Sequence, residues 1–449
     1  MLLSFRAANH RSLRDEQHLL LTPVYPDSAP RDAEWGAVPV VGVFGPNASG
    51  KSNVLDALTY MRRMVRGSFR ENEPGAGLER HPYALDSFQA EPSSFVVDLS
   101  LPGPNKTDIR YEYGFCVDDR QVTEEWMYSY PLGRRRRVFH RTLDGYSWGS
   151  HTADSMRSVE DLVESNVLFL SVAARSKQDE VRPVYDWFFR QVWVSRPGSY
   201  DRYREPLLFE QDDAFVSWLT RLLRSADTGI QGTEIIEESE EEFAARLGRV
   251  GERAERHASR MRTLVFRHRG EHGTARLDFR DQSTGTRSLI GLSRPIFNAL
   301  RHGATVLIDE LDASLHPYLS AHLIGLFQSP DTNPQGAQLI FTTHDAALLG
   351  RIQGVEVLKR DQIWFTEKDE CGRTELFPLT DFKPRKDDNR ELRYLAGRYG
   401  AVPTVTDELA LTALAQRGAP DDVPPDAQAR RPQSEVEGQQ ADRPGTTPR

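Results

Sequence analysis

A glycine-rich loop near the start of the chain constrains its fold more than any other feature. Residues 45–52 read Gly-Pro-Asn-Ala-Ser-Gly-Lys-Ser and directly follow the apolar run Val-Val-Gly-Val-Phe at 40–44. This is the pattern G-x-x-x-x-G-K-[ST], in which glycines let the backbone wrap a triphosphate and direct N–H groups at it. The sequence therefore predicts an α/β fold built around a strand, a phosphate-binding loop and a helix.

The residue types in this loop assign individual roles. Lys51 can reach the β- and γ-phosphates, and the Ser52 hydroxyl can ligate Mg²⁺. The helix that we expect to begin near Lys51 adds its positive N-terminal end to the phosphate site. The predicted nucleotide-binding residues in this segment are Gly45, Pro46, Asn47, Ala48, Ser49, Gly50, Lys51, Ser52 and Asn53.

A second apolar strand ends in two carboxylates. Residues 304–310 read Ala-Thr-Val-Leu-Ile-Asp-Glu, a continuous run that suits a parallel strand covered on both faces. Adjacent acids at a strand end are often only solvated. Beside a phosphate loop, Asp309 is instead predicted to hold Mg²⁺, and Glu310 to polarise the attacking water.

Two further segments add candidate phosphate contacts. The apolar run 339–345, Leu-Ile-Phe-Thr-Thr-His-Asp, delivers His344 at a strand end, where open α/β sheets place their ligands. Residues 281–287, Asp-Gln-Ser-Thr-Gly-Thr-Arg, open a helical stretch over 288–300. Ser283 and Gly285 at a helix start can form an anion site, although such a step alone is an ordinary helix cap.

The order of these motifs resembles that of the ABC-type ATPases. The segments 45–53 and 309–317 look like the SMC/RecF/OLD branch, and residues 2–13 resemble the first strand of that branch, with His10 in place of its usual aromatic. The resemblance is strongest to the OLD-like, RloA-like bacterial ATPases, through 341–345, 381–386 and 397–403, and it covers about residues 1–403.

The resemblance implies a mechanism and partners. In such ATPases two chains sandwich ATP, so Ser283 of one protomer would cap the γ-phosphate held by Lys51 of the other, with His344 as a γ-phosphate sensor. The D-loop would be 313–316. Gln89, before the strand 94–99, is the candidate Q-loop residue and third metal ligand. ATP and Mg²⁺ are the implied cofactors, and adenine specificity rests on the resemblance.

Composition limits the alternatives. The net charge of −9 argues against a dedicated basic nucleic-acid binder. Cys116 and Cys371 are the two cysteines; they form no disulfide framework and suit a reducing compartment. With no apolar run of about 18 residues and no signal-like N-terminus, we expect a cytoplasmic protein without membrane contact.

The chain divides into four predicted segments. Residues 1–195 form the first half of the ATPase, including an antiparallel β subdomain with strands at 94–101, 109–117 and 122–130. Residues 196–262 form a small helical insertion, with Glu237 to Met261 as a charged helix. Residues 263–403 complete the mixed, largely parallel core flanked by helices. Residues 404–449 are polar and predicted to be disordered.

Several features bear on partners. The insertion is too short for the coiled coil of true SMC proteins, and the region after His344 has no room for the nuclease domain of OLD enzymes. Arg134 to Arg137 read first as a solvated turn and second as a site for nucleic acid or an acidic partner. Arg11 could reach the nucleotide.

Three functional hypotheses follow. The first is an ATP-gated dimer switch that controls a separately encoded, nuclease-like effector in anti-phage defence, which rests mainly on the resemblance. The second is a RecF-like DNA-binding ATPase in repair, for which binding should weaken steeply with salt. The third is a nucleotide-dependent scaffold without turnover. A transporter subunit is disfavoured because Glu310 is followed by Leu-Asp.

Overall fold

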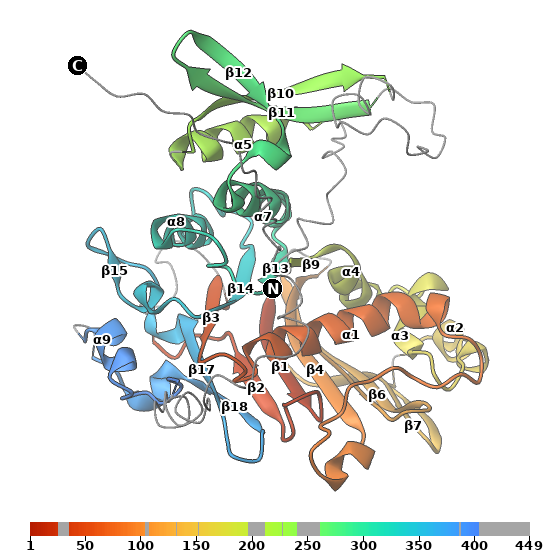
Figure 1. Cartoon of the computed structure of the whole chain (residues 1–449). Coiled ribbons are helices and arrows are strands. Elements are labelled where there is room, and N and C mark those ends of the chain that lie inside the picture. Colours follow the sequence, from red (N-terminus) through yellow and green to blue (C-terminus); the bar gives the residue numbers. More distant parts are fainter. Residues whose placement is uncertain are drawn as a thin grey trace, which may run out of the picture. The chain divides into compact units, whose positions relative to one another are not determined.

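A six-stranded sheet carries the phosphate loop, in the strand order β18, β17, β3, β14, β13 and β9. All neighbours are parallel except β18, which is antiparallel to β17. The strands are β3 (Val40–Phe44), β9 (Val192–Ser195), β13 (Thr305–Ile308), β14 (Gln338–Thr343), β17 (Ile363–Lys368) and β18 (Thr374–Pro378) (Figure 1). The computed structural model describes residues 1–25, 36–103, 107–131, 133–150, 152–195, 212–226, 228–239, 261–385 and 388–403.

Both faces of this sheet are covered. In β3 all five residues are buried, and alternate side chains enter different cores: Val41 and Val43 join one, Val40 and Phe44 the other. The first core is shared with α1 (Lys51–Glu71), α3 (Phe169–Arg175) and α4 (Arg182–Arg190), and the second with α7 (Thr284–His302) and α8 (Pro317–Gln328). Burial on both faces explains why these strands read as continuous apolar runs.

The second large sheet has seven strands and is antiparallel throughout, in the order β2, β1, β4, β5, β6, β7 and β8. Its strands are β1 (Leu2–Ala8), β2 (Gln17–Leu20), β4 (Ser93–Pro102), β5 (Asp108–Val117), β6 (Val122–Tyr130), β7 (Arg136–Thr142) and β8 (Gly145–Trp148). It packs on the α1 side, where Tyr113 of β5 meets Phe188 of α4 with 6.1 Å between ring centroids. The predicted β subdomain is confirmed, and with it the α/β class with a mixed core sheet flanked by helices.

The predicted insertion is only partly helical. Helix α5 (Asp213–Ser225) lies within it and is capped by Asp212, whose Oδ1 accepts from the Phe215 amide at 3.1 Å. It is followed by a three-stranded antiparallel sheet of β10 (Ile230–Glu238), β11 (Met261–Gly270) and β12 (Gly273–Leu277), drawn with α5 in Figure 1.

The helical interpretation was therefore wrong for β10 and for the start of β11. It counted the acidic residues after 236 as a helix start, whereas the β-branched residues before them favour a strand that pairs with β11. Residues 240–260 of the predicted charged helix lie outside the described residues. The rings of Phe215 and Phe297 of α7 have centroids 5.4 Å apart, so α5 packs against the helix that begins at the Ser-x-Gly motif.

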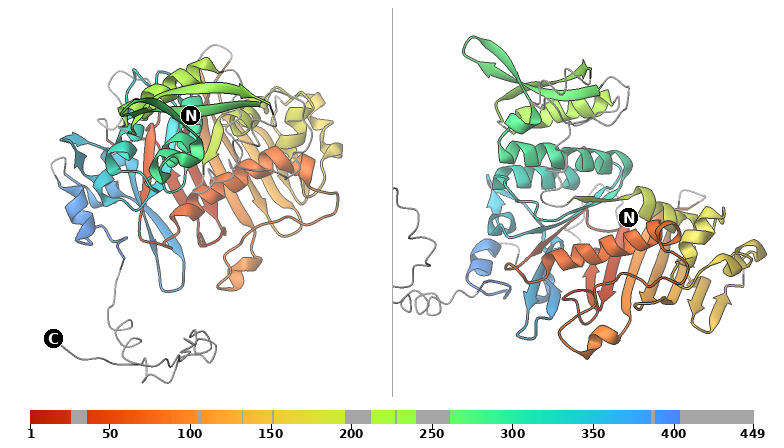
Figure 2. Two further views of the ribbon diagram at one scale, coloured as in Figure 1. Left: turned by 45° about the horizontal axis from the view of Figure 1, so that its top comes forward. Right: turned by 45° about the vertical axis from the view of Figure 1, so that its right-hand side comes forward.

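The C-terminal part completes the core sheet with a hairpin. β17 and β18 pair around residues 369–372, and Figure 2 shows this hairpin beside β3 in two further views. The remaining elements are η2 (Ser87–Ala90), α2 (Asp154–Arg157), η3 (Glu160–Leu162), η4 (Phe279–Asp281), η5 (Ala346–Leu349), β15 (Arg351–Ile352), β16 (Val355–Glu356), η6 (Arg360–Gln362), η7 (Leu379–Phe382) and α9 (Arg390–Leu395). The predicted tail, 404–449, lies outside the described residues. Among the described helices, none is long and apolar enough to cross a bilayer.

Candidate nucleotide-binding site

The phosphate loop joins β3 to α1 through backbone that needs glycine at two positions. Gly45 has φ 154° and Gly50 has φ 107°. A Cβ at Gly45 would lie 2.5 Å from the Thr366 carbonyl oxygen, and one at Gly50 would collide with the Thr374 side chain. Helix α1 begins at Lys51, so its first N–H groups, which have no partner within the helix, are free to face an anion.

Lys51 is folded against its own loop. Its Nζ donates to the carbonyl oxygens of Gly45 at 2.8 Å and Pro46 at 2.9 Å. Burial lowers the pKa of Lys51, while the carboxylates of Asp312, Glu310 and Asp309 act in the opposite direction. The ammonium group thus lies between the phosphate loop and the acids that follow β13, where a phosphate group would meet it.

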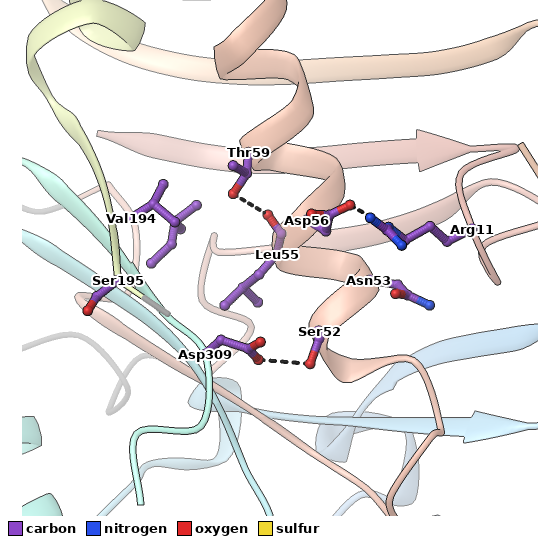
Figure 3. A pocket seen from close by; sticks show the side chains of 10 residues that line it. Arg11, Ser52, Asn53, Leu55, Asp56, Thr59, Val194, Ser195 and Asp309 are labelled. Atoms are coloured by element: carbon purple, nitrogen blue, oxygen red, sulfur yellow. Dashed lines mark hydrogen bonds and ion pairs between the residues drawn. The ribbon is translucent and has the colours of Figure 1, made fainter. Parts of the chain in front are cut away.

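Two predicted metal ligands, Ser52 at the start of α1 and Asp309 after β13, meet directly. Ser52 Oγ donates to Asp309 Oδ1 at 2.9 Å (Figure 3). Thr342 of β14 donates to the same oxygen at 2.6 Å and accepts from the Glu310 amide at 2.7 Å. Thr342 is fully buried. Sequence reasoning gave it no role, although it lies in the segment that delivers His344.

Glu310 and His344 extend from the ends of neighbouring strands. Residue Glu310 is exposed and has φ 52°, a left-handed conformation that costs a non-glycine residue roughly 1–2 kcal/mol. The side chain of His344 is 61% exposed, and its Nδ1 lies 3.2 Å from Asp312 Oδ2. Because β13 and β14 are parallel neighbours, both residues emerge at the same edge of the sheet as the phosphate loop.

Ser283 and Gly285 form the start of α7. Ser283 is its N-cap, and its Oγ accepts from the Thr286 amide at 3.1 Å. A Cβ at Gly285 would lie 2.6 Å from the carbonyl oxygen of Ser314, which follows Glu310 in the predicted D-loop and has φ 63°. The helix start therefore packs on the loop that carries Glu310, but neither Ser283 nor Gly285 lines the cavity beside Ser52.

That cavity, of about 200 Å³, lies between the start of α1 and the ends of β9 and β13 (Figure 3). Arg11 reaches it and is held by Asp56, whose Oδ2 accepts from Arg11 Nε at 2.5 Å and lies 3.0 Å from His10 Nε2. The lining residues are Arg11, Ser52, Asn53, Leu55, Asp56, Thr59, Val194, Ser195, Leu307 and Asp309. Arg11 and Ser52 thus line the same cavity, and contact of Arg11 with the nucleotide stays a prediction.

Gln89 is not brought to this cavity. It lies exposed in η2, and its backbone carbonyl accepts from Arg80 Nη2 at 2.8 Å. The cavity lining beside Ser52 and Asp309 does not include it. The segment before β4 instead forms a loop capped by Asp86, so the geometry gives no support to Gln89 as a metal ligand.

A set of buried hydroxyl groups braces the phosphate loop from behind. Ser49 Oγ lies 2.7 Å from Thr366 Oγ1, and Thr374 Oγ1 donates to the Ser49 carbonyl at 2.7 Å. Ser12 Oγ lies 2.7 Å from Thr374 Oγ1 and accepts from Asn53 Nδ2 at 2.6 Å. Asn53 therefore supports the loop through Ser12. These contacts join segments far apart in the chain, so no local motif reveals them.

Comparison with known proteins gives a family. The family model described as "AAA domain, putative AbiEii toxin, Type IV TA system" matches residues 40–350. No curated protein sequence matches the chain significantly.

Solved structures similar to this one include two Smc heads. One, the SmcHead bound to the C-winged helix domain of ScpA, has a TM-score of 0.42 and 13% identity, covering 85% of this chain and 99% of its own. The other, an Smc head domain with an extended coiled coil bound to the C-terminal domain of ScpA, derived from Pyrococcus furiosus, has a TM-score of 0.41 and 11% identity, covering 85% and 97%.

The family match spans the phosphate loop, the strand that ends in Asp309 and Glu310, and the strand that ends at His344. The chain belongs to the AAA-domain family described as putative AbiEii toxin, type IV toxin–antitoxin system.

Proposed function

We propose that this chain is a Mg²⁺-dependent ATPase of the ABC type that works as an ATP-gated dimer switch for a separately encoded effector. The observation that carries the ATPase assignment is the cluster of Ser52, Asp309 and Thr342, with Lys51 and Glu310 beside it. The family match, which covers all of these residues, supports a nucleotide-dependent activity.

The oxygen atoms of this cluster fit Mg²⁺. Ser52 Oγ and Asp309 Oδ1 are hard oxygen donors 2.9 Å apart, the ligand type that Mg²⁺ prefers together with phosphate oxygens and water. Ser52 and Asp309 would hold the ion, and Thr342 fixes the orientation of the carboxylate. When bound, the ion supplies charge stabilisation at the phosphate oxygens.

The remaining residues divide the work of hydrolysis. Lys51 would exchange its two carbonyl partners for phosphate oxygens of ATP, and the N–H groups at the start of α1 would donate to the same phosphates. Glu310 is exposed and free to orient the attacking water. His344 would donate to the γ-phosphate and stabilise the charge that develops there. These roles require Glu310 and His344 at one sheet edge, as β13 and β14 place them.

Dimerisation would complete the site. The chain carries one copy of each motif, and the exposed residues of α7 and the D-loop include Ser283, Ser314 and His316. In a sandwich, the partner subunit's Ser283 would cap the γ-phosphate bound to Lys51. ATP binding to the closed form alone would stabilise the dimer by mass action, and hydrolysis would release it.

We also propose an effector outside this chain. The family description names toxin–antitoxin systems, which fits action through a second protein. We propose that this protein is nuclease-like and that the pair acts in anti-phage defence; the closer OLD-like assignment stays a prediction.

A DNA-binding repair ATPase is the second candidate. It is favoured by Arg267 and Arg269, which are exposed on β11, and disfavoured by the net charge of −9. If this function is correct, duplex DNA should stimulate hydrolysis, and the stimulation should fall steeply as salt is raised.

Phosphate release from ATP tests the proposed activity. We expect hydrolysis by the wild type, loss of hydrolysis in Lys51→Ala and Glu310→Gln, and normal hydrolysis in Lys368→Ala, a matched change at an exposed lysine. Equal, negligible turnover in wild type and Glu310→Gln would instead support a scaffold. Salt-sensitive stimulation by duplex DNA would favour the repair ATPase.

A further inference from the structure

Asp312 lies directly behind the histidine that is predicted to sense the γ-phosphate. His344 Nδ1 is 3.2 Å from Asp312 Oδ2, and the side chains are 61% and 5% exposed respectively. The two residues come from different loops, one after β13 and one after β14, which pair in parallel. A buried carboxylate thus supports an exposed ring on the side away from solvent.

The contact with His344 is the main interaction that offsets the cost of burying the Asp312 carboxylate. Its other oxygen, Oδ1, is buried and has no hydrogen-bond partner among the described residues. Lys51, whose pKa the Asp312 carboxylate acts to raise, donates instead to the carbonyls of Gly45 and Pro46. Burying a carboxylate is costly unless it is paired, so the His344 ring is the partner that the geometry assigns to Asp312.

The chemistry of imidazole gives this contact a consequence. A neutral ring carries one proton, and the nitrogen that faces a carboxylate is the one that carries it. An acceptor at Nδ1 therefore fixes both the ring orientation and the position of the proton, and leaves Nε2 directed away from Asp312. Carboxylates behind histidine ligands of metal ions act in the same way.

We propose that Asp312 is a positioning residue for hydrolysis, which holds the His344 ring through Nδ1 so that Nε2 meets the γ-phosphate. This inference rests on the proposed ATPase function. Asp312 does not touch the nucleotide in this account, and the ring that it holds in place is that of His344.

A double-mutant cycle tests whether Asp312 acts through His344. We expect Asp312→Ala to lower kcat roughly 10-fold or more, the scale typical of carboxylates behind functional histidines, with little change in KM. In His344→Ala the further change Asp312→Ala should cost almost nothing, because the group through which it acts is absent. Asp312→Asn keeps an acceptor for Nδ1–H and should recover part of the loss.

The matched control is Asp345→Asn. Asp345 is the carboxylate that follows His344 in the loop after β14, but it accepts from the Ala347 amide at 3.0 Å and not from the ring. Its kcat should stay within about twofold of the wild type, because asparagine keeps the acceptor for the Ala347 amide and only the charge is lost. Thermal unfolding of every variant shows whether a loss of rate reflects a loss of folded protein.

A second readout needs no nucleotide. Nitrogen-15 NMR of histidine-labelled protein in mildly alkaline buffer reports which ring nitrogen carries the proton, and His344 is assigned by the resonance lost in His344→Ala. We expect the Nδ1–H form in the wild type and its loss in Asp312→Ala. An unchanged His344 tautomer in Asp312→Ala, or fully additive losses in the cycle, would overturn the inference.

The two failures are distinguishable. A wild-type protein that binds but does not hydrolyse ATP contradicts the proposed function and leaves the NMR result to decide the His344–Asp312 contact. A wild type that hydrolyses ATP and loses rate additively in the cycle contradicts the role of Asp312 alone.

Discussion

Ser52 and Asp309, which are 257 residues apart in the chain, share a hydrogen bond of 2.9 Å. The first lies at the start of α1 and the second at the end of β13, and β14 lies between β3 and β13 in the sheet. Thr342 from β14 donates to the same carboxylate oxygen at 2.6 Å. The contact therefore depends on the assembled sheet, and it gathers the hydroxyl and carboxylate that a Mg²⁺–nucleotide complex requires.

Replacement of Thr342 by valine should impair the metal site, because it removes the hydroxyl group and keeps a side chain of similar volume. The variant leaves the Glu310 amide without its acceptor, which costs about 1–3 kcal/mol of stability, and frees Asp309 to rotate. We expect the Mg²⁺ concentration for half-maximal turnover to rise, or turnover to fall, roughly 10–100-fold, as for other residues that orient metal ligands. Mg²⁺ titration of phosphate release measures this.

The control is Thr220→Val on α5. The Thr220 hydroxyl donates to the Val216 carbonyl at 2.9 Å, in a segment that contributes no residue to the site. This variant should lose stability but keep its Mg²⁺ dependence. A Thr342→Val protein with wild-type Mg²⁺ dependence would show that Asp309 is oriented by other groups.

Gly285→Ala should separate nucleotide binding from dimerisation. Its Cβ would lie 2.6 Å from the Ser314 carbonyl oxygen, so either α7 or the D-loop must shift. Binding of ATP to the phosphate loop of the monomer should survive, while ATP-dependent association and turnover fall. Fluorescent-nucleotide binding and light scattering measure the two properties.

Gly325→Ala is the matched change within α8, because a Cβ there meets nothing within 4 Å. It should stabilise the protein by roughly 0.5–1 kcal/mol and leave association intact. If Gly285→Ala associates like Gly325→Ala, the helix start of α7 does not belong to the dimer interface.

Asp56 should make folding stability depend on acidity. Burial alone would raise its pKa, but hydrogen bonds from His10 and Arg11 outweigh burial and hold the pKa well below its usual range. A pKa lower in the folded chain means that the stabilisation is complete above the unfolded value, about 4, and is lost as the pH falls below it.

Urea unfolding of wild type and Asp56→Asn over a series of pH values checks this expectation. The difference in unfolding free energy between the two proteins should be constant near neutrality and should shrink in acid. A difference that grows as the pH falls would mean that the Arg11 and His10 contacts do not stabilise the carboxylate.

The two cysteines should differ in reactivity. Burial raises the pKa of Cys116 to about 11, so its thiolate is scarce at neutral pH, whereas Cys371 is exposed at the tip of the β17–β18 hairpin. Since the thiolate is the reacting form, iodoacetamide should label Cys371 and spare Cys116 in the folded chain. Mass spectrometry of the native and the guanidinium-unfolded protein checks both sites, and native labelling of Cys116 would contradict the raised pKa of this half-buried thiol.

Local motifs predicted the parts of the site that lie within single segments. A glycine-rich loop and apolar runs that end in polar residues are visible without a structure. They therefore predict that Gly45 to Ser52, Asp309 and His344 follow the ends of strands. Thr342 was missed because its role arises from the pairing of Ile308 with Phe341 across two strands, and a single sequence does not reveal which residues face each other.

The misjudged segments have physical reasons as well. The strand β10 was taken for part of a helical insertion because its acidic end resembles a helix start, while its pairing with β11 sets its structure. The place of Gln89 before β4 suggests a metal ligand, but hydrogen bonds with Arg80 and Asp86 hold its loop, and Gln89 is not in the lining of the cavity beside Ser52. In the sequence Asp312 is one residue of the motif 309–317, and its contact with His344 depends on two loops that only the folded chain brings together.

The mass of Glu310→Gln in solution tests the proposed switch most directly. Light scattering with Mg²⁺ and ATP should give twice the mass of the chain, because ATP binds and is not hydrolysed, and the single-chain mass with ADP or without nucleotide. Glu370→Gln, a change at an exposed glutamate of the β17–β18 hairpin, should hydrolyse ATP normally and not accumulate as a dimer. One and the same mass for Glu310→Gln with ATP, with ADP and without nucleotide would contradict the ATP-gated dimer.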